Sequence, residues 1–210
     1  MKIKTDEIAS VIKQEIGAKA PLLCSQASYG GVGGVFRESK LDLVDMHAYW
    51  QHPYFPNRAR DANDYRIDNT PMVRDPNGGV LAALSMHRAA GLPFIVTEYD
   101  HPAPSEYAAE IVPLLYAYAA WQDWDGAFTF AYKGDPSDKI TSFFDMGNHP
   151  AKMAFYPAAA RIFLGGGVAP SPAAHTLVVP DQRVPEVVAR RTDYSFWLSA
   201  DDATRPTVRD

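Results

Sequence analysis

Cysteine is almost absent from the sequence: Cys24 is the only one among 210 residues. A single cysteine excludes a disulfide within the chain and any zinc site built from several thiolates. Cys24 lies in an apolar run, which favours a buried and chemically inert thiol. The six histidines show no ligand spacing with neighbouring acids that indicates a metal site. We therefore expect neither a metal nor another cofactor.

Long apolar runs and basic clusters are missing as well. No stretch is long enough to cross a bilayer, and residues 1–6 are too charged for the start of a signal peptide. The net charge is −5 and no basic run stands out, which argues against a nucleic-acid face or an anionic membrane surface. From the sequence we expect a soluble chain, cytoplasmic as written, with no nucleic-acid or membrane partner.

Among the features that are present, an apolar run that leads directly into an acid comes first. Phe94-Ile95-Val96-Thr97 precedes Glu98, and a proline-containing turn follows. A strand that is apolar throughout is buried on both faces, as in a parallel sheet covered by helices. A carboxylate at the carboxyl end of such a strand sits where α/β barrels keep their catalytic groups. An acid in this position can also cap the next turn or pair with an arginine, so both interpretations stay open.

A second strand, expected over Leu41–Trp50, carries polar residues in its second half. Asp45, His47 and Tyr49 alternate with apolar residues, so the three fall on one face of the strand. A polar face at the end of an otherwise apolar strand is typical of the mouth of a barrel. The alternative is a hydrogen-bonded core histidine with a tyrosine partner.

The whole pattern alternates strands and helices, which predicts an α/β fold with parallel strands and right-handed crossovers. The expected strands are residues 21–26, 41–50, 93–98 and 126–132, and the expected helices are 5–18, 79–90, 105–121 (with a kink at Pro113) and 150–164 (with a break at Pro157). Gly30–Gly34 is expected to form a surface turn, and residues 51–77 a long excursion beside the site. Residues 1–167 then form the main domain, and residues 168–210 a β-prone C-terminal appendage with strands at Thr176–Val179 and Tyr194–Leu198.

With these residues placed, the chain resembles the second half of a (β/α)8 glycoside hydrolase of the cellulase and β-galactosidase clan. In that family a barrel strand ends in a nucleophilic Glu, and Val96-Thr97-Glu98-Tyr99 is similar to its sequence. The preceding strand commonly ends in Asp-x-His-x-Tyr, as Asp45-Met46-His47-Ala48-Tyr49 does here. The resemblance covers about residues 5–165 and equates the four expected strands with strands five to eight of the barrel.

The resemblance implies half of a TIM barrel and a retaining hydrolase of β-glucans, cellulose or β-galactosides, with Glu98 as nucleophile. The family's acid/base is a Glu after an Asn on strand four, and no Asn-Glu pair occurs in this chain. Half a barrel also leaves two open strand edges, which favours closure by a second copy. Asp135 of that second copy is the candidate acid/base. The family often has Trp at the end of strand eight, where this chain has Phe130 and Tyr132.

The expected partners are an oligosaccharide or polysaccharide and a second copy of the chain. The residues expected to contact the sugar are Gln26, His47, Tyr49, Trp50, Tyr99, His101 and Tyr132. One alternative is a non-catalytic remnant of a truncated hydrolase that binds sugar and turns nothing over. The other is an unrelated α/β protein in which Glu98 only caps a turn.

Overall fold

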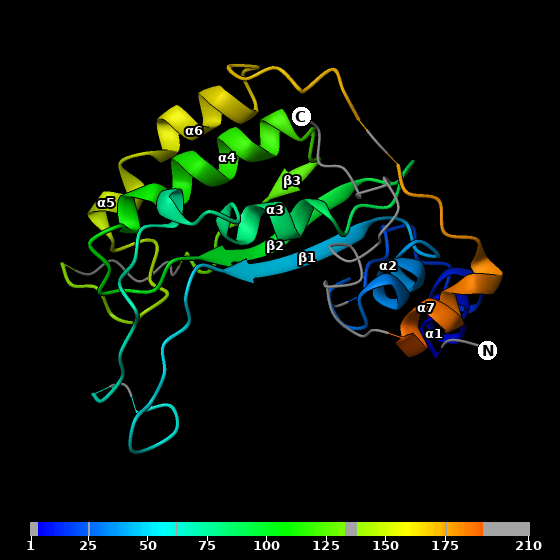
Figure 1. Cartoon of the computed structure of the whole chain (residues 1–210), viewed down its shortest axis with the longest axis horizontal. Helices are drawn as coiled ribbons and strands as arrows, with labels where there is room; N and C mark the ends of the chain where they lie inside the picture. Colours follow the sequence, from blue (N-terminus) through cyan, green and yellow to red (C-terminus); the bar gives the residue numbers. More distant parts are fainter. Residues whose placement is uncertain (1–3, 25, 62, 133–137, 175, 191–210) are drawn as a thin grey trace. The chain divides into compact units, whose positions relative to one another are not determined.

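A computed structural model describes residues 4–24, 26–61, 63–132, 138–174 and 176–190 (Figure 1). The chain divides into two compact units. Unit 1 consists of Met1–His47, Ala83–Ile95 and Pro172–Asp210, and unit 2 of Ala48–Ala82 and Val96–Ser171. The described residues 172–174 and 176–190 therefore group with the N-terminal part of the chain.

The strands form one three-stranded sheet in the order β1-β2-β3 (Figure 1). The strands are β1 (Val44–Tyr49), β2 (Phe94–Asp100) and β3 (Gly126–Ala127). The backbone bond from Val44 N to Pro93 O is followed by one from Trp50 N to Asp100 O, so β1 and β2 advance in the same direction. This parallel sheet with its helices confirms the predicted α/β class.

The strand predicted over residues 21–26 does not form in the described part of that segment. Among the described residues the sheet therefore has three strands instead of the expected four. The backbone N–H groups of that segment bond to side chains instead of a neighbouring strand. Leu22 N donates to Asp42 Oδ2 at 2.7 Å, and Cys24 N donates to Glu38 Oε2 at 3.2 Å. Carboxylates that accept backbone N–H groups compete with a sheet ladder for the same donors.

The last strand is also shorter than the predicted 126–132. Beyond Ala127, Phe128 N and Phe130 N still donate to carbonyls of β2, but the next amide, Ala131 N, turns to Phe144 O at 2.9 Å. Backbone pairing with β2 therefore continues to Phe130, and from Ala131 the chain pairs with a later segment, residues 143–146.

Unit 2 contains several helical segments, two of which pack against each other through aromatic rings. The segments are η2 (Met72–Arg74), η3 (Ala108–Glu110), α4 (Ile111–Trp121), α5 (Pro150–Met153) and α6 (Tyr156–Phe163). α4 and α6 lie side by side (Figure 1), and the Tyr116 ring centroid is 6.1 Å from that of Tyr156 and 5.8 Å from that of Phe163. α3 (Gly79–Ser85) follows η2 and has residues in both units.

Two prolines determine where these helices begin. Pro113 is the third residue of α4, in the first turn, where its missing N–H has no helical partner to lose. The prediction of a kink at Pro113 is therefore wrong, because the helix proper starts only at Ile111. Pro157 occupies the first turn of α6, and the break between α5 and α6 precedes it, as predicted.

Unit 1 contains helices at both ends of the chain. They are α1 (Lys4–Ser10), the π-helical turn η1 (Val11–Glu15), α2 (Val32–Glu38), η4 (Asp181–Arg183) and α7 (Val184–Arg190). Gly30 and Gly31 lie in a turn, as predicted, but α2 begins at Val32 and takes up the rest of the predicted surface turn Gly30–Gly34. A Cβ on Gly34 would collide with Ala27 O, so the glycines let this helix approach the preceding chain closely.

In the described part of the predicted β-prone tail, regular structure is confined to the helices η4 and α7. No strand forms in residues 168–174 or 176–190, and Thr176–Val179 is irregular. Val184 and Val187, three residues apart on α7, are both buried, and Val187 packs with Val32 of α2. Burial of an apolar stripe with helical spacing outweighs the β propensity of valine. The strand predicted at Tyr194–Leu198 lies outside the described residues.

None of the helices in the described ranges combines the length and the apolar character that a membrane span requires.

His87 gives unit 1 a testable dependence on pH. The side chain is fully buried, its Nδ1–H donates to Ala83 O at 2.9 Å, and burial lowers its pKa to about 4. Below pH 6.5 the unfolded chain takes up a proton that the folded chain accepts only near pH 4, so stability is lost across that window. Between pH 7 and pH 4.5, we expect the free energy of unfolding to fall by roughly 2 kcal/mol more in the wild type than in His87→Gln.

The measurement is urea unfolding of the wild type and the variant at both pH values, with His52→Gln as an exposed control. An unchanged pH dependence in His87→Gln would contradict the assignment.

Candidate functional site

In unit 2, the carboxylate of Glu98 is hydrogen-bonded to a tyrosine on the adjacent strand. The Tyr49 hydroxyl donates to Glu98 Oε2 at 2.6 Å, and both side chains are partly exposed. The pair forms because the carboxyl ends of parallel strands meet at one edge of the sheet. Burial, and then the neighbouring Glu98 carboxylate, raise the pKa of Tyr49 well above its usual 10. The phenol therefore stays protonated and remains the donor.

An extra residue in β2 accompanies this carboxylate. Phe128 N donates to Val96 O at 2.8 Å and Phe130 N donates to Tyr99 O at 2.9 Å. Phe128 and Phe130 are two residues apart, whereas their partners in β2, Val96 and Tyr99, are three residues apart. β2 therefore has one additional residue, at Thr97 or Glu98. Bulges of this kind change the direction of a side chain and are frequent beside functional sites. Here the alternation of the strand changes at the residue that carries the carboxylate.

Three rings surround the phenol of Tyr49 and form with it what we call the aromatic cluster: Tyr49, His52, Phe130 and Phe144. The Tyr49 centroid lies 4.5 Å from Phe144, 5.1 Å from His52 and 6.3 Å from Phe130. Phe130 is 41% exposed, so part of the cluster faces solvent beside the carboxylate. The site thus combines an acidic group, a hydroxyl donor and accessible ring faces.

Backbone bonds hold the loop that contributes Phe144. Ala103 N donates to Phe143 O at 2.7 Å, and the bond between Ala131 N and Phe144 O fixes the next residue. Met146 N returns to Ala131 O at 3.2 Å. The loop is therefore held by Ala103, which follows β2, and by Ala131, which follows β3. These bonds place Phe144 against Tyr49.

Tyr99 and His101, predicted to contact sugar, are buried: their exposed fractions are 0% and 1%. The Tyr99 hydroxyl lies 3.2 Å from His101 Nε2 and donates to Met72 Sδ at 3.5 Å. Burial, and then the nearby Lys152 charge, lower the pKa of His101 to about 3, so its ring is neutral. Neither ring presents a stacking face to solvent, because both are enclosed in unit 2.

The other predicted contacts of unit 2 differ in exposure. The Trp50 indole is partly buried, and its Nε1–H donates to Thr70 O at 2.8 Å, so the predicted excursion holds it in place. Tyr132 is 69% exposed and is available for contact with a ligand. Asp135, the predicted acid/base, lies outside the described residues.

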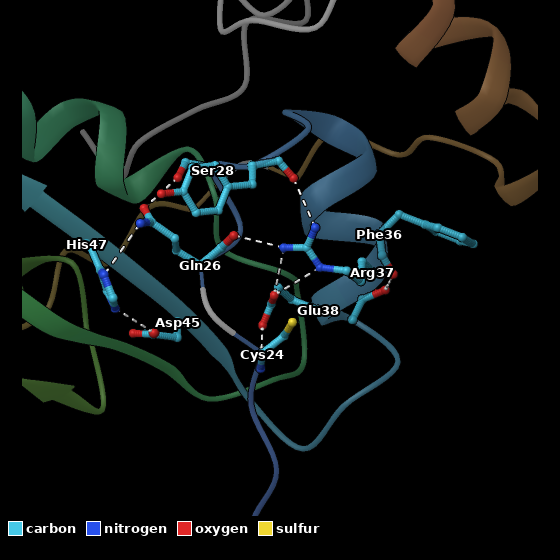
Figure 2. A network of polar contacts seen from close by, with 10 residues as sticks. Cys24, Gln26, Ser28, Phe36, Arg37, Glu38, Asp45 and His47 are labelled. Atoms are coloured by element: carbon cyan, nitrogen blue, oxygen red, sulfur yellow. Dashed lines mark hydrogen bonds and ion pairs between the residues drawn. The ribbon is translucent and has the colours of Figure 1, made fainter. Parts of the chain in front are cut away.

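In unit 1, a chain of polar contacts links Gln26 and His47 (Figure 2). Ser28 Oγ donates to Gln26 Oε1 at 2.7 Å, and Gln26 Nε2 lies 3.4 Å from His47 Nδ1. His47 Nε2 lies 3.1 Å from Asp45 Oδ2. An amide nitrogen can only donate, so His47 Nδ1 is the acceptor and Nε2–H donates to Asp45. The two residues predicted for sugar contact are thus joined within this unit, with a defined histidine tautomer.

The backbone beneath Gln26 is held by an arginine of α2 (Figure 2). Arg37 Nη2 donates to Gln26 O at 2.8 Å and to the buried Glu38 Oε1 at 3.0 Å. Glu38 also accepts the N–H of Cys24, so one carboxylate orients both the arginine and the preceding chain. This arrangement fixes the position of Gln26 without using its side chain.

Comparison with protein-family models, with curated proteins and with solved structures found no match. Within the described residues, no group of three or more His, Cys, Asp or Glu side chains is placed to hold a metal ion.

Sequence analysis missed Phe144 and Lys152, which the structure places beside the predicted strand ends. Lys152 is fully buried against Asp100, the last residue of β2. Both lie beyond Tyr132, in or next to a segment without regular periodicity. The one available signal is the pair Phe143-Phe144, because adjacent aromatics in an otherwise polar loop indicate an anchored segment.

Proposed function

We propose that the protein is a retaining β-glycoside hydrolase in which Glu98 is the nucleophile. The observation that carries the proposal is the 2.6 Å bond from Tyr49 to Glu98 at the exposed edge of the aromatic cluster. A carboxylate that accepts a bond from a fixed hydroxyl keeps a defined orientation. Ring faces beside it suit the apolar faces of a pyranose. The resemblance of both strand ends to the cellulase and β-galactosidase clan points the same way.

In the proposed reaction, Glu98 attacks the anomeric carbon and the bond to the departing sugar oxygen breaks. The resulting glycosyl ester is then hydrolysed by water, which releases the sugar and restores the carboxylate. The departing oxygen needs a proton, and a second carboxyl group has to supply it.

The acids next to Glu98 in unit 2 do not suit that second role. Asp100 and Asp145 are both 0% exposed. Asp100 pairs with Lys152, and Asp145 accepts bonds from Thr141 and Asn148. We assign the acid/base to Asp135 of the partner subunit in a homodimer that closes the half barrel.

Exposed apolar side chains support such a dimer. In unit 1, three apolar side chains near the start of the chain face solvent: Ile8 is 52%, Val11 41% and Ile16 70% exposed. In unit 2, Phe128 beside the short strand β3 is 57% exposed. Open strand edges and exposed apolar patches favour association with a second copy. Sedimentation equilibrium at micromolar concentration tests this, and a purely monomeric mass would rule the dimer out.

A sugar-binding protein without turnover is the second candidate. The burial of Asp100 and Asp145 favours it, because no acid of the same chain adjoining Glu98 along β2 or beside Lys152 is open to a ligand. Binding without hydrolysis would support this candidate. The absence of both binding and hydrolysis would leave the interpretation of Glu98 as a structural acid.

The experiment for the proposed function is hydrolysis of aryl β-glucoside, aryl β-galactoside and soluble cellulose, with binding measured in parallel by calorimetry. Hydrolysis of at least one of the three supports the proposal. Binding of the sugars with no release of product would replace it with the second candidate.

Tyr49→Phe tests the carboxylate partner directly. The variant keeps the ring in the aromatic cluster and removes only the hydroxyl that donates to Glu98. A hydrogen bond to a charged group contributes about 1.5–3 kcal/mol, so we expect kcat to fall roughly 10- to 100-fold. Tyr54→Phe, at a tyrosine that is 49% exposed in the same unit, is the matched control. Equal activity of Tyr49→Phe and the control would contradict a role for the hydroxyl.

A further inference from the structure

A fully buried lysine contacts the end of β2, the strand that carries Glu98. Lys152 comes from α5, is 0% exposed, and its Nζ donates to Asp100 Oδ1 and to His101 O, each at 2.6 Å. Asp100 is also 0% exposed. Buried charges are costly, and apolar residues often replace such pairs without loss of stability. The pair therefore calls for an explanation other than stability.

The contacts of Lys152 fix the backbone just beyond Glu98. Asp100 Oδ1 accepts the ammonium and also the His101 backbone N–H at 2.7 Å. The same two residues are thus held twice, once through the Asp100 carboxylate and once through the His101 carbonyl. Two short bonds from one ammonium define the course of the chain at this point.

The same end of β2 also holds the strand that carries Tyr49. Trp50 N donates to Asp100 O at 3.0 Å, and Trp50 directly follows Tyr49, whose hydroxyl donates to Glu98. Lys152 therefore fixes, through Asp100, both the end of β2 and the end of β1. The distance between the Tyr49 hydroxyl and the Glu98 carboxylate depends on these two strand ends.

The surroundings of Lys152 contain few other charges that could replace it. His101 and His149 lie nearby, and for both rings burial, followed by the Lys152 charge, lowers the pKa. Both are therefore neutral near pH 7. Asp145 is the other acid that acts on the pair. Asp100 Oδ2 has no hydrogen-bond partner among the described residues, so the ammonium is the main support of this carboxylate.

We propose that Lys152 is a positioning residue, which sets the geometry of the Tyr49–Glu98 pair by holding Asp100 and His101 at the end of β2. It touches no substrate. Its kinetic consequence rests on the proposed glycoside hydrolase activity, whereas its effect on the strand ends does not. The geometry requires that removing the ammonium loosens the carboxyl ends of β1 and β2 and leaves their first residues unchanged.

The test compares Lys152→Met with Lys19→Met, an exposed lysine, by residue-resolved amide hydrogen exchange and by kinetics. We expect exchange at the Trp50 and His101 amides to become at least about 10-fold faster, because local opening near a loosened contact costs less. The Val44 amide, bonded to Pro93 O at the other end of β1, is expected to stay unchanged. In kinetics, kcat should fall about 100-fold with KM within about threefold, as for a misplaced reacting group.

Unchanged exchange at Trp50 and His101 in a folded variant would overturn the proposal, and so would a kcat within about threefold of an active wild type. A loss of folded protein alone would lower activity without the local exchange pattern. If Lys152→Met does not fold, the double variant Lys152→Met/Asp100→Asn removes both charges and takes its place. Unchanged hydrogen exchange at its Trp50 amide would then overturn the proposal. If the wild type hydrolyses no glycoside but exchange accelerates at the strand ends, the positioning role stands and the proposed function falls.

Discussion

Glu98→Gln is expected to lower kcat on aryl β-glycosides by at least about 1,000-fold. Glutamine keeps the length of the side chain and can still accept the bond from Tyr49, whose hydroxyl lies 2.6 Å from Glu98 Oε2. What it loses is the negative charge that attacks the anomeric carbon, and no covalent intermediate can form without it. Because the shape is kept, substrate binding should change far less than turnover.

Initial rates measured side by side for the wild type, Glu98→Gln and Glu106→Gln check this expectation. Glu106 is an exposed acid eight residues further along the chain, so its substitution is matched in chemistry and differs in place. The control should retain wild-type activity. A Glu98→Gln variant with more than about a tenth of wild-type kcat would remove Glu98 from the reaction.

Lys152→Met is expected to destabilise unit 2 by about 3–5 kcal/mol at pH 8, because the variant leaves the buried Asp100 carboxylate without its cation. Burial already raises the pKa of Asp100 to about 7 against the opposing charge of Lys152. In the variant the carboxyl group takes up a proton as the pH falls, and a neutral acid is far cheaper to bury than a charged one. We therefore expect the loss of stability to shrink substantially at pH 5.

Chemical unfolding of the wild type and Lys152→Met at pH 8 and pH 5 measures both values. Asp100→Asn/Lys152→Met is the companion variant, since it removes both charges and should recover part of the stability at pH 8. An equal loss at the two pH values would show that Lys152 does not act through the charge of Asp100.

Much of the sheet could be predicted because its residues form continuous apolar runs. Phe94–Val96 and the alternating second half of β1 gave both strands and their parallel pairing. The strand expected over 21–26 failed for a reason that the run itself does not contain. Its N–H groups are taken by Asp42 and Glu38, which lie 20 and 14 residues away in the sequence.

The helices α2 and α7 were missed because local propensity favoured other structures. Glycines dominate the start of α2, and valines and prolines surround α7, so propensity predicts a turn and strands there. The structure shows instead that Val187 of α7 packs with Val32 of α2. This contact joins residues 155 positions apart, and a pattern confined to one segment cannot report it.

Some residues of the candidate site could be predicted from local sequence, and others could not. Glu98 and Tyr49 were each predicted at the end of a strand, and the structure places them in contact. The burial of Tyr99 was not foreseen, because an extra residue at Thr97 or Glu98 changes the alternation of β2 and no glycine or proline marks it. Phe144 and Lys152 come from a later segment that returns to the strand ends, and only the fold brings them there.

The most direct test of the account is whether Glu98 forms a covalent bond to a sugar. A 2-deoxy-2-fluoro-β-glycoside with a dinitrophenolate leaving group suits this test. Such a leaving group departs without a proton, and the fluorine slows hydrolysis of the ester. The acid/base is therefore not needed for the adduct to form.

Intact-mass spectrometry followed by peptide mapping is the measurement. The account predicts a mass increase of one fluorosugar per chain, located on Glu98 and absent from Glu98→Gln. An adduct on another residue, or an unmodified chain when the same sugar is shown to bind, would contradict Glu98 as the nucleophile.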